Sequence, residues 1–99
     1  MNRQQVLDAA IECVTKTRQD MHGNPENSFR IIANMWSAYL AEKRGMMFCL
    51  DAEDVAWMMV LLKVARSISN PKNQDNGIDA AGYAALAIEL ANNEADDAG

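Results

Sequence analysis

One long apolar segment, residues 51–68, constrains the fold of this chain more than any other feature. Its sequence is DAEDVAWMMVLLKVARSI, and Lys63 is the only polar residue between Val55 and Val64. In a helix, these apolar residues leave no side of the helical wheel free, which is typical of a helix surrounded by other helices. The segment therefore predicts a central core helix, with three other helices packed around its middle, Val55–Leu62.

Three other segments have helical periodicity. Apolar residues recur at three- and four-residue steps in the ranges 3–20, 28–43 and 78–92. Gly23 and Pro25 break the pattern between the first two, with Asn27 or Ser28 as the expected N-cap of the second, and Gly45 ends it. The chain is thus predicted to be all-α, a compact antiparallel four-helix bundle.

Two short features of this bundle carry specific expectations. The run Met46–Leu50 is apolar but has no second strand candidate to pair with, so a packed loop or interface is favoured over a strand. Asp51 is the expected N-cap of the core helix. Gly82 in the middle of the last helix costs about 1 kcal/mol relative to Ala, and close approach of another helix would compensate for this.

Composition restricts the partners and the location of the protein. A net charge of −5 argues against direct nucleic-acid binding. No apolar run reaches the ~20 residues of a membrane span, so a cytoplasmic protein without membrane contact is expected. Cys13 and Cys49 are expected to be buried, reduced thiols. Residues 1–92 are predicted to form a single helical domain and residues 93–99 an acidic disordered tail.

Seven Met residues and the apolar run Met46–Leu50 suggest an interaction surface. Met is a flexible residue that often lines such surfaces. We therefore expect a homo-oligomer, with a two-fold symmetric homodimer as the simplest form.

Charged residues meet at one end of the predicted bundle. Lys63 and Arg66 close the core helix, and Asp75 and Asp79 surround the start of the last helix, one turn before Tyr83. Three interpretations fit: a structural ion-pair cluster, a pocket that uses the cations to bind a phosphate or nucleotide, or a weak Mg²⁺ site formed by the two acids.

His22 is the only histidine, and it lies four residues after Arg18 in a turn rich in Gly and Asn. A surface turn residue is the simpler interpretation, and a binding or proton-transfer role is the alternative. Arg18 and His22 are both candidate ligand-binding residues. The sequence has no nucleophile motif, Gly-rich phosphate loop or Cys/His ligand spacing, so it identifies no catalytic residue.

Three blocks carry a resemblance to a known family. They are HGNPEN followed by FRIIA and WSAYL, then DVA, MM, LK and AR within residues 54–66, then DN and DAAGY within residues 75–83. In this order they resemble a family of small, uncharacterised all-helical proteins encoded by phages and prophages. The resemblance implies an accessory protein that acts in the bacterial host.

A more distant resemblance rests on the helical pattern and on the Asp-x-x-x-Tyr spacing of Asp79 and Tyr83. In these features the sequence resembles MazG-like nucleoside triphosphate pyrophosphohydrolases. The resemblance implies an all-α, oligomeric, MazG-like fold that holds Mg²⁺ with acids on two helices, and it carries over only Asp75 and Asp79. The second predicted helix has no acid before Glu42.

Two hypotheses for function follow. The first is a phage or prophage accessory protein that binds or hydrolyses a nucleotide at the end formed by Lys63, Arg66, Asp75, Asp79 and Tyr83. The second is a non-catalytic interaction protein, such as an inhibitor of host defence or a nucleotide sponge. Under the second hypothesis the partner is a host protein or a nucleotide that is held without turnover.

Overall fold

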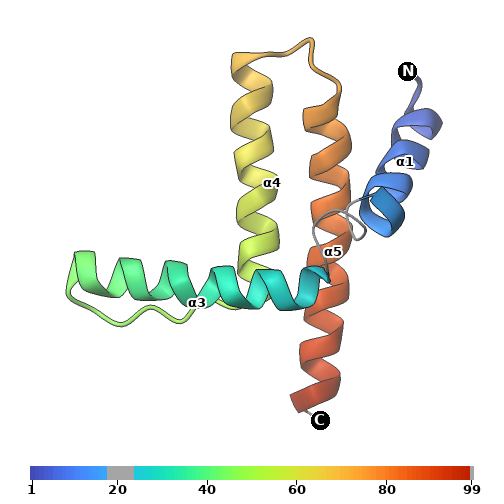
Figure 1. Cartoon of the computed structure of the whole chain (residues 1–99). Coiled ribbons are helices and arrows are strands. Elements are labelled where there is room, and N and C mark those ends of the chain that lie inside the picture. Colours follow the sequence, from blue (N-terminus) through green and yellow to red (C-terminus); the bar gives the residue numbers. More distant parts are fainter. Residues whose placement is uncertain (18–23, 99) are drawn as a thin grey trace.

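A computed structural model of the chain describes residues 1–17 and 24–98. Helix α1 (Arg3–Glu12) continues into a π-helical segment, η1 (Cys13–Thr17). It is followed by α3 (Pro25–Arg44), α4 (Ala52–Ser69) and α5 (Asp75–Ala98) (Figure 1). Every regular element in these two ranges is helical, which confirms the all-α class.

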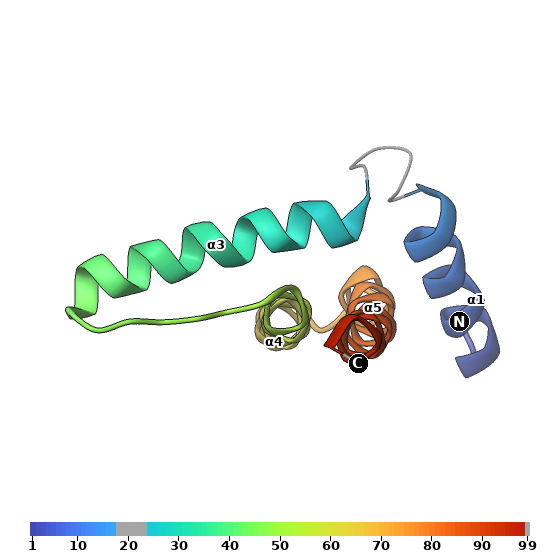
Figure 2. The same ribbon diagram turned by 90° about the horizontal axis from the view of Figure 1, so that it is seen from below.

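Helices α4 and α5 form an antiparallel pair with the most extensive contact in the fold (Figure 1). Helix α3 does not run alongside them: it crosses one face of the pair and projects past α4 (Figure 2). Helix α1 packs against α5 on the side away from α4. The expected antiparallel bundle is thus realised by α4 and α5, while α3 lies across them.

The start of α3 differs from the expectation. Asn24 is the N-cap, and its side chain accepts a hydrogen bond from the Glu26 N–H at 2.8 Å. Pro25 occupies the first helical position, where its fixed φ suits a helix and its missing N–H is not needed. The predicted cap at Asn27 or Ser28 is therefore wrong, because Pro25 begins the helix instead of interrupting it. Gly45 ends α3 as predicted, and the structure shows it in the left-handed conformation, with φ 69°.

Residues 46–50 form a loop that runs back beneath the projecting end of α3 (Figure 1). The Leu50 N–H donates to Ser37 Oγ at 2.9 Å, and Leu50 packs against the core. Met46 and Met47 are exposed. The prediction of a loop is confirmed. Cys49 is exposed as well, so its predicted burial is wrong, because this part of the loop passes outside the core.

Helix α4 begins as predicted. Asp51 caps it by accepting from the Asp54 N–H at 2.8 Å, and Asp54 accepts from the Asp51 N–H at 3.0 Å. Only Val55 and Ala56 of this helix are buried. The prediction that α4 is surrounded on all sides is therefore wrong for this chain, since α5 and the crossing α3 cover only part of its circumference.

Helix α5 occupies the central position. Helices α1 and α4 both contact it, and the ring of its Tyr83 stacks on that of Phe29 in α3, with centroids 6.1 Å apart. The buried core lies where these helices meet and comprises Phe29, Ala33, Val55, Ala56, Tyr83, Leu86, Ala87 and Leu90. The core is therefore concentrated around α5.

Gly82 marks the place where the N-terminal segment approaches α5. A Cβ atom at this position would lie 3.6 Å from the Val14 Cβ and 3.9 Å from the Ala10 carbonyl oxygen. The predicted close approach of another helix is confirmed. Helix α5 continues to Ala98, past its expected end at Asn92. No helix in the described ranges has the length and apolar character needed to span a bilayer.

Candidate functional site

A polar cavity of about 360 Å³ lies at the turn that joins α4 to α5, and we call it the α4–α5 pocket. The last turns of α4 supply its cations, and the connection and first turn of α5 supply amides and carboxylates. Its lining residues are Lys63, Arg66, Ser69, Asn70, Asn73, Asp75, Asn76 and Asp79. The four charged residues expected at this end of the fold therefore line one cavity.

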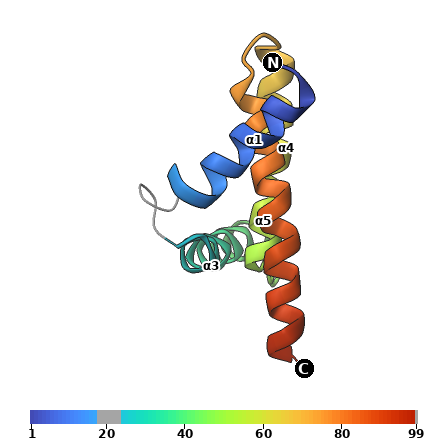
Figure 3. The ribbon, with the colours of Figure 1, turned by 90° about the vertical axis from the view of Figure 1, so that its right-hand side faces the viewer.

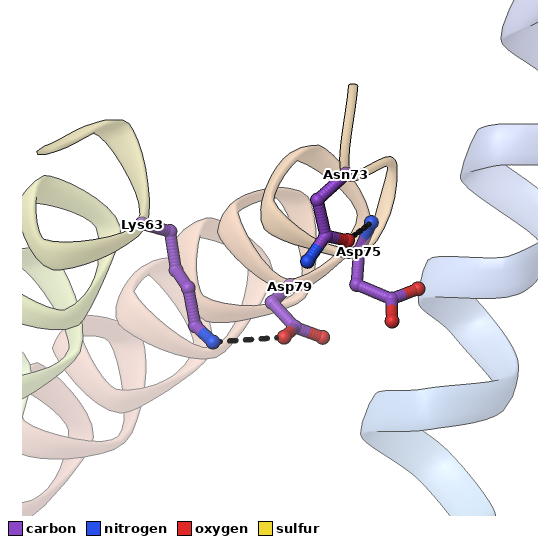
Figure 4. Close-up of polar contacts among 4 residues, drawn as sticks. All are labelled: Lys63, Asn73, Asp75 and Asp79. Atoms are coloured by element: carbon purple, nitrogen blue, oxygen red, sulfur yellow. Dashed lines mark hydrogen bonds and ion pairs between the residues drawn. The ribbon is translucent and has the colours of Figure 1, made fainter. Parts of the chain in front are cut away.

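Lys63 and Asp79 form an ion pair across the two helices. The Lys63 Nζ lies 3.0 Å from Asp79 Oδ2, and the two side chains are 14% and 19% exposed (Figure 4). Because a charge held away from water needs a partner, the carboxylate explains how a lysine is accommodated within an apolar segment. This contact matches the structural interpretation of these two residues.

The other two charges have different surroundings. Arg66 is exposed and has no ion pair within the described part of the chain. Asp75 is also exposed; its backbone N–H donates to Asn73 Oδ1 at 2.9 Å, and its side chain points away from Lys63 (Figure 4). Arg66 is therefore the cation of the pocket that is available to an incoming anion.

The carboxylates offer little to a metal ion. Among the residues that the structure describes, no group of three or more His, Cys, Asp or Glu is placed to hold one. Asp79 already binds the ammonium of Lys63. A Mg²⁺ ion at Asp75 and Asp79 would have to compete with this lysine and would draw its remaining ligands from water.

The amide side chains of the pocket are not among the site residues predicted from the sequence. Asn70 and Asn73 lie in the connection between α4 and α5, and Asn76 lies in the first turn of α5. Residues 69–75 are exposed. Asn76 is nevertheless buried. The signal that could have found these residues is the density of Asn between two helices that converge, because amides offer both donors and acceptors to a ligand.

Of the three other candidates, the structure describes Tyr83 alone, and it lies outside the pocket. The Tyr83 ring is buried in the core against Phe29 and does not line the cavity. One turn after Asp79, α5 has already passed from the pocket into the core. Arg18 and His22 lie outside the described residues.

The family of the chain follows from its match to a domain model. A model described as a domain of unknown function, DUF6378, matches residues 5–91, which is most of the sequence. The chain belongs to the DUF6378 family. The α4–α5 pocket lies within the matched region, so it is part of the DUF6378 domain.

Two relatives of this DUF6378 chain come from phages. The Gene 55 protein of Mycobacterium phage L5 is 41% identical over 81 residues, which cover 82% of this chain and 49% of the relative. The Gene 55 protein of Mycobacterium phage D29 is 32% identical over 79 residues, 80% of this chain and 48% of the relative. The chain thus spans about half the length of these relatives. The predicted similarity to phage-encoded proteins is confirmed, and no solved structure matches the chain significantly.

Proposed function

We propose that this DUF6378 protein is a phage accessory protein that binds a nucleotide through its phosphates in the α4–α5 pocket. The observation that supports this proposal is the position of Arg66 at the edge of a polar cavity, an exposed guanidinium with no carboxylate partner among the described residues. Arginine binds phosphate oxygens bidentately and keeps its charge at any physiological pH. The phage relatives support the accessory role.

The size and lining of the pocket suit such a ligand. A cavity of about 360 Å³ falls at the lower end of the range of small-molecule sites, roughly 300–1,000 Å³. Phosphates would lie against Arg66, and the base or sugar would contact the amides of Asn70 and Asn73. Lys63 adds less attraction, because Asp79 neutralises it at 3.0 Å.

Binding is better supported than hydrolysis. The MazG-like hydrolytic form would need Mg²⁺, and Asp75 and Asp79 are the acids available in the pocket. If that form is correct, pyrophosphate release requires Mg²⁺ and is abolished by Asp79→Asn. Tight binding without release of products corresponds instead to a nucleotide sponge.

Calorimetric titration with nucleoside mono-, di- and triphosphates, with and without Mg²⁺, tests the proposal. Arg66→Gln should weaken binding by about 10- to 100-fold, the worth of a charged hydrogen bond. The matched control is Arg30→Gln, which removes an exposed arginine on α3 outside the pocket. If the wild-type protein binds none of these compounds, or if both variants lose affinity equally, nucleotide binding at this pocket is refuted.

A second candidate function is that of a non-catalytic interaction protein, such as an inhibitor of host defence. It is favoured by the apolar residues that α3 leaves exposed, Ile31, Met35 and Tyr39. These lie four residues apart along the helix, as do anchors that bind in a partner's groove. Phage challenge of a defended bacterial strain that expresses the protein tests this function. Met35→Asp should abolish protection, while Arg66→Gln should retain it.

A further inference from the structure

A continuous apolar stripe runs along the outer side of α4. Trp57, Leu61, Val64 and Ile68 are spaced four, three and four residues apart, so they lie on one side of the helix. They are 41%, 66%, 47% and 78% exposed. The same spacing forms the narrow seam of two helices that pack as a coiled coil. We call these four residues the α4 seam.

No described helix covers the outer side of α4. Helix α5 lies on one side of α4, and α3 crosses one face of the pair (Figure 2). A side view with the pair upright shows α1 and α3 on the same side of α5, with no described helix opposite them (Figure 3). The most apolar helix of the chain is therefore only partly covered.

The chain as a whole exposes more surface than a compact monomer of its mass. A compact monomer of 10.9 kDa has an accessible surface of roughly 5,600 Å². This chain has 6930 Å², about 1,300 Å² more. The radius of gyration is 14.8 Å, compared with about 13 Å for a compact domain of this length. A stable interface of standard size buries about 800 Å² on each partner, which is less than the excess exposed by the chain as a whole.

We propose that the α4 seam binds the α4 seam of a second copy of this chain, with the two helices antiparallel about a two-fold axis. The distribution of charge selects this arrangement. Helix α4 begins with Glu53 and Asp54, and Lys72 follows its end. A parallel pair would place like charges together, whereas an antiparallel pair places each acidic start beside a basic end and aligns the helix dipoles favourably.

The spacing also gives the register. An axis midway between Leu61 and Val64 places Leu61 against Val64 of the partner subunit, and Trp57 against Ile68 of the partner subunit. Glu53 then faces Lys72 of the partner subunit. Within one chain, the Trp57 Nε1–H donates to Glu53 Oε2 at 3.2 Å, which holds both side chains at the start of the seam. This interface is independent of nucleotide binding, since it uses no residue of the α4–α5 pocket.

Sedimentation equilibrium of the full chain tests the dimer. The wild-type protein should have twice the mass of one chain, 10.9 kDa. Ile68→Glu should return the monomer mass with an unchanged helical circular dichroism spectrum, because the side chain is exposed in a single chain. Ile88→Glu is the matched control, because it makes the same change at a residue of α5 that is 57% exposed. This variant should remain dimeric. A monomeric wild-type protein at high concentration overturns the proposal, as does an Ile68→Glu variant that remains dimeric.

A charge exchange tests the antiparallel register. Glu53→Lys and Lys72→Glu should each raise the dimer dissociation constant by about tenfold, because the two-fold axis doubles the effect of each change. The double variant should restore the wild-type constant. If both single variants dissociate more readily and the double variant adds their effects, the antiparallel register is wrong.

Discussion

Helices α4 and α5 are antiparallel neighbours, yet they are buried to very different degrees. Helix α4 is rich in large apolar residues, yet only Val55 and Ala56 of the whole helix are buried. Helix α5 is rich in alanine, and its buried residues extend from Asn76 to Leu90. In this fold the more apolar helix is thus the more exposed one.

The difference shows what decides burial in a small helical protein. Gly82 and the alanines of α5 let neighbouring backbones approach closely, so that several helices can pack around one. Large side chains in α4 fill the space on one side, and their remaining area stays outside. The apolar content of a helix measures how much surface it could bury against any partner. Small residues in a helix indicate where other helices of the same chain pack against it.

The largest expected effect compares a leucine of each helix. Leu86→Ala removes a buried side chain of α5 and should lower the free energy of unfolding by about 2–5 kcal/mol. Leu61→Ala changes a side chain that is 66% exposed and should alter the free energy of unfolding by less than about 0.5 kcal/mol. Both are to be measured by urea unfolding in the Ile68→Glu background, where association through the α4 seam is removed. Equal losses would show that the outer side of α4 is buried within one chain.

The sequence predicted the parts of the fold that depend on local chemistry. The cap at Asp51, the end of α3 at Gly45 and the close approach at Gly82 all follow from one residue and its neighbours. The central position of α5 was missed, because periodicity does not distinguish an apolar face that packs inside the chain from one that faces outward. Pro25 was read as a break, although at the first helical position it favours a helix.

The candidate site was predicted in part for a similar reason. Lys63 and Asp79 lie at the joined ends of two consecutive antiparallel helices, so their convergence follows from topology. The place where the pocket ends and the core begins depends on the direction in which each turn of α5 points. Tyr83 therefore could not be separated from the pocket by spacing alone, and the buried Asn76 could not be separated from an exposed turn.

A smaller effect is expected at the closest approach to α5. Gly82→Ala adds a Cβ at 3.6 Å from the Val14 Cβ, an ordinary contact, and should raise the free energy of unfolding by up to about 1 kcal/mol because alanine favours the helix. Gly82→Leu must displace α1 and should lower it by about 1–3 kcal/mol. Thermal unfolding of both variants measures the difference. If leucine were tolerated as well as alanine, the packing of α1 against α5 would be refuted.

The smallest expected effect compares how the two helices begin. Asp51 starts α4 in a reciprocal capping box with Asp54, while at the start of α5 Asn73 Oδ1 accepts one hydrogen bond, from the Asp75 N–H. Asp51→Ala should therefore cost about 1 kcal/mol of unfolding free energy, and Asn73→Ala about half as much. Urea unfolding in the Ile68→Glu background measures both. A larger loss at Asn73 would mean that the pocket turn, and not the cap of α4, holds the two helices together.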